Sequence, residues 1–185
     1  CRLAADGLTA SCGCYALHSA AGGVGIAAIQ YAQRVGAEVF ATASAPKHDF
    51  LRSLGVKHIS TSRDPEVFKR EMKGMVGDRG VDVVLNSLTS QNFIAESLAL
   101  LAPNGRFVEI GKRDIWGAPA VKCERRDVAY SIVALDMLPA LSNSLLLQRL
   151  AQGLALGLLG SGLGFVYGLE AASAAVRRMA GAKHV

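Results

Sequence analysis

Residues 19–25 have the sequence SAAGGVG, and their glycines could form the floor of a phosphate-binding site. They follow an apolar run and lead directly into the helix-like sequence IAAIQYAQRVGA. Glycine lets the backbone approach a pyrophosphate closely, and a helix N-terminus presents free N–H groups with a partial positive charge. The glycines could instead serve only the packing of a helix against a strand. The order strand, turn, helix favours a dinucleotide-binding turn.

The end of the second expected strand decides which dinucleotide would fit. An acidic residue there binds the adenosine ribose 2′-OH and selects NAD, whereas a basic or hydroxyl environment accepts a 2′-phosphate. Here the strand ends in Thr42-Ala43-Ser44 without a carboxylate, and Lys47 follows. Asp49 comes later, inside the next expected helix. Ser44 and Lys47 therefore predict NADPH as the cofactor.

Apolar strand-like runs alternate with helical patterns along residues 14–136. Strands are expected at 14–18, 38–43, 57–60, 81–86, 106–110 and 129–135. Helices are expected at 23–35, 46–54, 64–75 and 92–101, with Asp64-Pro65 as a cap and Pro103-Asn104-Gly105 as a turn. This alternation indicates βαβ units on a parallel sheet. The predicted fold is α/β, a doubly wound Rossmann sheet with helices on both faces.

The composition excludes several classes of protein. A length of 185 residues with 51% hydrophobic and 19% charged content is typical of a folded domain. The net charge of +5 suits an anionic ligand, but the positive charges are scattered and no nucleic-acid partner is expected. Residues 145–164 have the length of a membrane span, yet Gln148, Arg149 and Gln152 interrupt them. We expect a soluble amphipathic helix there, and no membrane association.

The four cysteines, Cys1, Cys12, Cys14 and Cys123, form no C-x-x-C pair, and the four histidines have no ligand spacing relative to them. No metal site is therefore expected. The cysteine pattern and the lack of a signal peptide indicate a reduced, cytoplasmic protein. The chain begins without Met, which suggests a piece of a longer protein.

Four blocks occur in order: HSAAGGVGIAAIQYAQRVGAEVFATAS, STSRD, GVDVVLNSL and LLAPNGRFVEIGKRD. Together they resemble the enoyl reductase domains of modular polyketide synthases and animal-type fatty acid synthases. These domains belong to the zinc-free, quinone-oxidoreductase-like branch of the medium-chain dehydrogenase/reductase superfamily. The resemblance implies an NADPH-binding Rossmann domain at 12–136 and, at 137–185, a C-terminal helical segment that belongs to an incomplete substrate domain. The family's N-terminal half has no counterpart here.

The resemblance also implies roles for individual residues. The cofactor-binding residues that it implies are Ala21, Gly22, Gly23, Val24, Gly25, Ser44, Lys47, Arg63, Asn86 and Gly111. Lys112 of EIGK and Asp136 of ALDM match the lysine and aspartate proposed as catalytic or substrate-positioning groups. By type and spacing alone, Asn86 would be a strand-end turn residue, Lys112 a loop cation and Asp136 a helix cap.

The implied reaction is the NADPH-dependent reduction of a 2,3-enoyl thioester on an acyl carrier protein. Lys112 would stabilise the enolate or donate the proton, and Asp136 would orient it. Ketoreductase and dehydratase domains are the implied neighbours. Two alternatives stay open: a stand-alone NADPH quinone or enone reductase, and a non-catalytic NADPH-binding structural domain of a synthase. With the substrate half missing, we expect the chain alone to bind NADPH weakly without reducing a thioester.

Overall fold

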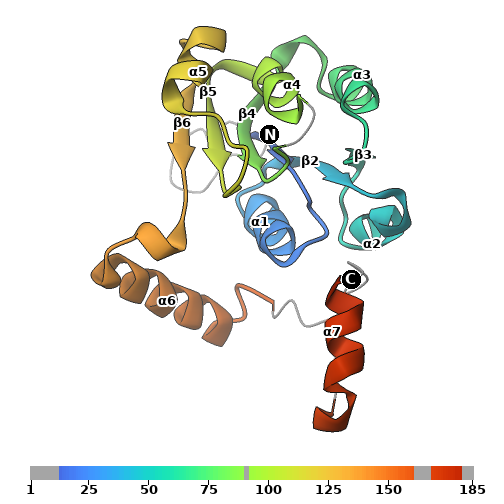
Figure 1. Cartoon of the computed structure of the whole chain (residues 1–185), viewed down its shortest axis with the longest axis vertical. Coiled ribbons are helices and arrows are strands. Elements are labelled where there is room, and N and C mark those ends of the chain that lie inside the picture. Colours follow the sequence, from blue (N-terminus) through green and yellow to red (C-terminus); the bar gives the residue numbers. More distant parts are fainter. Residues whose placement is uncertain (1–12, 90–91, 161–167, 181–185) are drawn as a thin grey trace.

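The computed structural model describes residues 13–89, 92–160 and 168–180. Its six strands form one sheet in the order β3-β2-β1-β4-β5-β6, and every neighbouring pair is parallel (Figure 1). The strands are β1 (Cys14–Leu17), β2 (Glu38–Ala43), β3 (His58–Thr61), β4 (Val81–Asn86), β5 (Leu101–Glu109) and β6 (Ala129–Ile132). The chain reverses its direction of travel across the sheet between β1 and β4, as in a Rossmann fold. The predicted fold class is confirmed.

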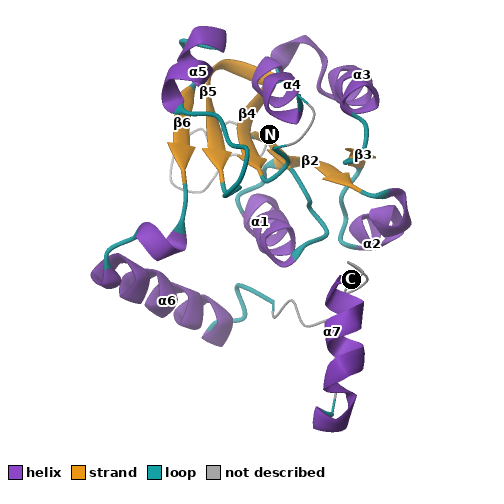
Figure 2. Cartoon of the chain, in the orientation of Figure 1, coloured by secondary structure: helices purple, strands orange, loops and turns teal. Residues whose placement is uncertain are grey.

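Helices cover both faces of the sheet, as Figure 2 shows. The helices are α1 (Gly23–Arg34), α2 (His48–Ser53), α3 (Pro65–Val76), α4 (Phe93–Ala99) and α5 (Ala118–Glu124). Successive side chains of a strand point to opposite faces. Accordingly, Val39 and Ala41 of β2 pack in a cluster with α1 and α2, whereas Phe40 packs in a second cluster with α3, α4 and α5.

Local sequence signals account for several helix boundaries. The carboxylate of Asp64 accepts hydrogen bonds from the backbone N–H groups of Glu66 and Val67 at 2.9 and 3.1 Å, and Pro65 occupies the first turn of α3. This is the expected N-terminal cap. A single 3₁₀ turn containing Pro46 precedes α2, where one continuous helix was expected.

The region around residues 99–105 differs from the prediction. Helix α4 ends at Ala99 and β5 begins at Leu101, so Pro103-Asn104-Gly105 lies inside a strand and is not a separate turn. The pairing with β4 shifts register there, from Val81–Leu101 to Val83–Arg106. An irregularity of this kind inserts extra residues into one strand while the ladder continues on both sides. The predicted separate turn is therefore wrong, and the strand predicted at 106–110 begins earlier, at Leu101.

Two further differences concern the end of the sheet. Strand β6 stops at Ile132, short of the expected residue 135, and a 3₁₀ turn follows at Leu135–Met137. Helix α5 was not expected, because its seven residues are too few to show helical periodicity in the sequence.

The last two helices, α6 (Ala140–Ala155) and α7 (Ala172–Ala180), lie apart from the sheet and its covering helices (Figure 1). Among the described residues, no helix is both long and apolar enough to cross a membrane. Residues 161–164, at the end of the segment expected as an amphipathic helix, lie outside the described residues, and so do Cys1, Cys12 and His184.

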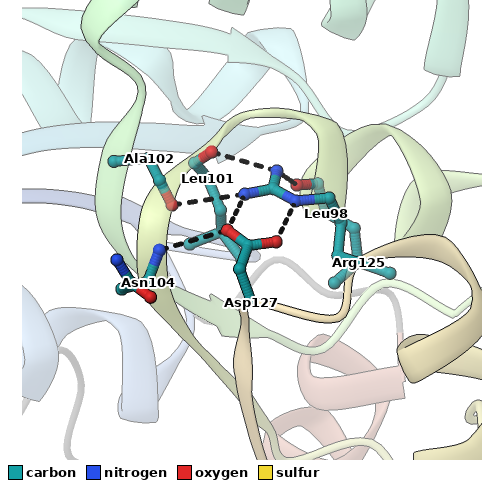
Figure 3. Close-up of polar contacts among 6 residues, drawn as sticks. All are labelled: Leu98, Leu101, Ala102, Asn104, Arg125 and Asp127. Carbon is teal, nitrogen blue, oxygen red and sulfur yellow. Dashed lines mark hydrogen bonds and ion pairs between the residues drawn. The ribbon is translucent and has the colours of Figure 1, made fainter.

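Arg125 lies at the start of β5, at the edge of the sheet opposite the carboxyl ends of the strands (Figure 3). Its guanidinium donates to the carbonyl oxygens of Leu98 and Leu101 at 2.9 and 3.1 Å, and it pairs with both carboxylate oxygens of Asp127. The hydrogen bond from Arg125 holds the pKa of Asp127 well below its ordinary value. The planar fork of arginine suits this two-sided arrangement. This ion pair therefore joins α4 and β5 to the segment between α5 and β6.

Candidate functional site

The glycine turn joins β1 to α1 at the carboxyl edge of the sheet. A Cβ atom on Gly25 would overlap the carbonyl and Cα atoms of Ala20, which are backbone and cannot move aside. Gly25 is therefore needed for the close packing of α1 against the turn. A Cβ on Gly23 would meet no atom within 4 Å. The packing role thus belongs to Gly25, and the open side of the turn is at Gly23.

The N-terminus of α1 can accept an anion. Gly22 is the N-cap residue, and no described side chain caps the helix or places an acid in its first turn. The first N–H groups of a helix have no partner within the helix and carry partial positive charge. Val24 is exposed beside them. These groups are free to bind a phosphate at the surface of the turn.

A cavity of about 370 Å³ lies against the turn and the ends of β2, β3 and β4. Its lining residues are Ser19, Ala21, Gly22, Ala43, Ser44, Lys47, Ser62, Arg63 and Leu88. The structure thus brings together Ala21, Gly22, Ser44, Lys47 and Arg63, which were all predicted as cofactor-binding residues. Two cations and several hydroxyl groups in one cavity have the chemistry to bind a phosphate group.

Ser62 is a lining residue that sequence reasoning missed. It follows β3 directly, and its backbone N–H donates to the carbonyl oxygen of Ala43 at 3.2 Å, which holds the ends of β2 and β3 together. Ligands of parallel α/β sheets bind outside the carboxyl ends of the strands. The same rule that selected Ser44 after β2 could therefore have selected Ser62 after β3.

His18 lies buried beneath the glycine turn, only 3% exposed. Its Nδ1 lies 3.1 Å from the hydroxyl of Thr42 and its Nε2 lies 2.8 Å from the hydroxyl of Ser97. The Ser97 hydroxyl donates to the carbonyl oxygen of Phe93 at 2.6 Å, so it must accept a hydrogen bond from Nε2–H of His18. Burial disfavours the charged imidazolium, and in the neutral ring Nδ1 is the acceptor for the Thr42 hydroxyl. Burial and the hydrogen bond to Ser97 together select a neutral histidine and one tautomer.

The Thr42 hydroxyl also accepts a hydrogen bond from the backbone N–H of Ser19 at 3.4 Å, and its carbonyl oxygen accepts one from Ala20 at 2.9 Å. Ser19 has a positive φ of 50°, which residues other than glycine rarely adopt. The contacts from Thr42 hold this strained residue at the start of the turn. His18 and Thr42 thus tie the glycine turn to the end of β2.

Acid should weaken the fold through His18. Burial lowers the pKa of His18 from 6.5 to about 3, so between these values the unfolded chain binds a proton that the folded chain does not. Its contribution to stability is complete above pH 6.5 and is lost as the pH falls, at about 1.4 kcal/mol per pH unit. The wild type and His18→Gln should therefore differ in their free energy of unfolding, measured in urea, and this difference should be about 2 kcal/mol smaller at pH 5 than at pH 7. An equal difference at both pH values would contradict a neutral buried histidine.

Asn86 lies beside the cavity but not in its lining. It is fully buried at the end of β4; its amide nitrogen donates to Glu109 at 2.6 Å and its amide oxygen accepts from the backbone N–H of Leu88 at 3.2 Å. Both polar atoms of the side chain therefore have protein partners. Gly111 also contacts Glu109, through a 2.7 Å hydrogen bond from its backbone N–H. Glu109, which was not predicted as a site residue, therefore holds Asn86 and Gly111 together.

Lys112 and Asp136 form an ion pair across the ends of β5 and β6. The Lys112 ammonium lies 2.8 Å from a carboxylate oxygen of Asp136, and the two side chains are 67% and 63% exposed. The hydrogen bond from Lys112 lowers the pKa of Asp136 below its ordinary value. Exposed ion pairs contribute little to stability. The predicted pair therefore meets in space and leaves an ammonium group accessible at the carboxyl edge of the sheet.

The sequence of this chain is similar to those of known proteins. A family model described as zinc-binding dehydrogenase matches residues 23–135. The spectinabilin polyketide synthase system protein NorB of Streptomyces orinoci is 51% identical over 126 residues, which are 67% of this chain and 6% of that protein. The chain thus spans a small fraction of the length of this curated relative.

Two solved structures share the fold. The crystal structure of CurK enoyl reductase superposes with a TM-score of 0.81 and 45% identity, covering 94% of this chain and 52% of that one. The nucleotide-binding subdomain of the enoylreductase domain of PpsC from Mycobacterium tuberculosis gives 0.69 and 36%, covering 80% and 85%.

The description of the family model names zinc, and the described residues offer no ligand set for it. In residues 13–89, 92–160 and 168–180 no three His, Cys, Asp or Glu side chains gather into a group that could hold a metal ion. Zinc sites need three or four such ligands converging on one point.

Proposed function

The chain belongs to the zinc-binding dehydrogenase family, and from this premise we propose that it forms the NADPH-binding part of an enoyl reductase in a polyketide or fatty acid synthase. One observation carries the proposal. The cationic cavity beside the glycine turn and the Lys112–Asp136 pair lie along the same carboxyl edge of the sheet. One bound ligand could then reach both. The similarity to CurK enoyl reductase supports this reading.

The cavity fits NADPH better than NADH. The first N–H groups of α1 would bind the pyrophosphate, and Ser44, Lys47 and Arg63 would bind the 2′-phosphate. No carboxylate lines the described cavity, so nothing there would repel the 2′-phosphate. The likeness to the nucleotide-binding subdomain of PpsC supports a nucleotide at this place.

When bound, NADPH supplies a hydride for the β-carbon of a 2,3-enoyl thioester. Negative charge then develops at the thioester oxygen, and the ammonium of Lys112 can stabilise that charge or donate the proton that reaches the α-carbon. The Asp136 carboxylate, 2.8 Å away, holds the ammonium in place.

We propose that the substrate is carried on an acyl carrier protein and that ketoreductase and dehydratase domains adjoin the enzyme. The alignment with a polyketide synthase protein over 6% of its length supports such a setting. We also keep the predicted division of the chain at residue 136. It is supported by the sheet's ending at Ile132 and by the separate position of α6 and α7 (Figure 1).

The proposal is tested on the full-length protein, in which this chain is joined to the substrate domain that the resemblance implies. That protein is mixed with NADPH and crotonyl-pantetheine. We expect NADPH oxidation together with a butyryl thioester detected by mass spectrometry. Faster NADPH oxidation with a quinone than with the thioester would favour a stand-alone quinone reductase. NADPH binding without oxidation by either acceptor would favour a structural domain, and would contradict the proposed activity.

A further inference from the structure

Glu109 is a fully buried carboxylate at the end of β5, with 0% of the residue exposed. One of its oxygens accepts a hydrogen bond from the amide nitrogen of Asn86 at 2.6 Å, and the other accepts one from the backbone N–H of Gly111 at 2.7 Å. A buried charge is costly unless hydrogen bonds satisfy it. Both carboxylate oxygens are satisfied here by neighbours that lie at the candidate site.

Further backbone hydrogen bonds join the end of β5, at Glu109 and Ile110, to the segments on both sides. The backbone N–H of Ile110 donates to the carbonyl oxygen of Asn86 at 2.9 Å, and the N–H of Val133 donates to the carbonyl oxygen of Glu109 at 2.8 Å. The segments that follow β4, β5 and β6 are thus all fixed relative to residue 109. The last of these segments leads to Asp136.

The segment after β5 leads directly to Lys112, and it has little freedom. A Cβ atom on Gly111 would lie 2.8 Å from the Glu109 carboxylate and 2.9 Å from the side chain of Thr89. The carboxylate therefore sits against the backbone of Gly111, one residue before the lysine. Lys112 in turn reaches Asp136 at 2.8 Å.

We propose that Glu109 is the positioning residue of this site: it couples the side chain of Asn86 to the backbone of Gly111 and so sets where Lys112 stands. The coupling is a property of the fold, whereas its consequence for turnover rests on the proposed function. Glu109 acts through the loop and touches no reacting atom.

The hydrogen-bond polarity of the cluster permits a sharp test. In Asn86→Asp two carboxylates would face each other, and in Glu109→Gln either the Asn86 amide or the Gly111 N–H would face another donor. In the double variant N86D/E109Q the two side chains exchange roles. The introduced carboxylate accepts from the introduced amide, the N–H of Leu88 keeps its acceptor, and so does that of Gly111. Every hydrogen bond in the cluster is restored with the same net charge.

The experiment compares the full-length wild type, both single variants and the double variant. We expect each single variant to lower kcat for crotonyl-pantetheine about tenfold while the Kd for NADPH stays within about twofold. Amide hydrogen exchange at Gly111, measured without substrate, should be faster in both single variants. The double variant should recover kcat and Gly111 protection to within about threefold of the wild type. Glu96→Gln, which removes an ion pair between α3 and α4, should change neither.

Single variants with wild-type kcat and Gly111 protection would overturn the proposal, and so would a double variant no better than the worse single. If Asn86→Asp does not fold, the double variant must restore folding, and its failure to do so overturns the coupling. A wild type that does not reduce the thioester refutes only the proposed function, because Gly111 exchange still tests the position of the loop.

Discussion

Replacing Lys112 with alanine should lower kcat for enoyl reduction about a hundredfold and leave the Kd for NADPH within about twofold. The reason is the position of the ammonium, which is exposed at the carboxyl edge and paired with Asp136 at 2.8 Å. The group can meet a substrate oxygen, and it lies outside the cavity lined by Lys47 and Arg63. Stopped-flow NADPH oxidation and a separate fluorescence titration of NADPH would measure the two quantities.

Asp136→Asn should have a smaller effect on kcat, about tenfold, because the introduced amide still accepts a hydrogen bond but carries no charge. The same stopped-flow assay would measure it.

Lys122→Ala provides a matched control for Lys112→Ala, since Lys122 is an exposed lysine of α5. It should leave both kcat and Kd unchanged. If Lys112→Ala reduced NADPH affinity as strongly as turnover, Lys112 would be a cofactor-binding residue instead.

The sheet was predictable because of where its strands lie. Central strands of a parallel sheet are buried on both faces, so they must appear as apolar runs, and VDVVLN of β4 and EVFATA of β2 do. The bounds of β5 were not predictable, because Pro103-Asn104-Gly105 has the composition of a turn. Only pairing with β4 shows that the strand continues through it.

The lining of the cavity was partly predictable from the positions at which strands end. Ser44, Lys47 and Arg63 follow β2 and β3, and strand ends are visible in the sequence. His18 and Glu109 were missed because their roles depend on partners far away in the chain, Ser97 and Asn86, which only the fold brings near. One signal was present: Asn86 and Glu109 are polar residues at the last positions of two apolar strands, and parallel pairing sets them side by side.

The preference for NADPH should depend on the two cations of the cavity. In the double variant K47A/R63A we expect kcat/KM for NADPH to fall about a hundredfold, with kcat/KM for NADH changed less than about threefold. NADH lacks the 2′-phosphate, so it gains nothing from these cations. Initial rates with each cofactor at a fixed concentration of crotonyl-pantetheine would give the four values.

The preference for NADPH over NADH should also be reversed by an added negative charge. A carboxylate introduced by Ser44→Asp at the end of β2 should repel the 2′-phosphate and accept a hydrogen bond from the ribose hydroxyl of NADH. Arg52→Ala removes a cation of α2 that pairs with Asp49 and lies outside the cavity, so it should leave the ratio of the two kcat/KM values unchanged. If K47A/R63A lowered kcat/KM equally for both cofactors, the cations would act on the pyrophosphate common to both. The recognition of NADPH would then have to lie in Ser44 and Ser62, the remaining hydroxyl groups at the ends of β2 and β3.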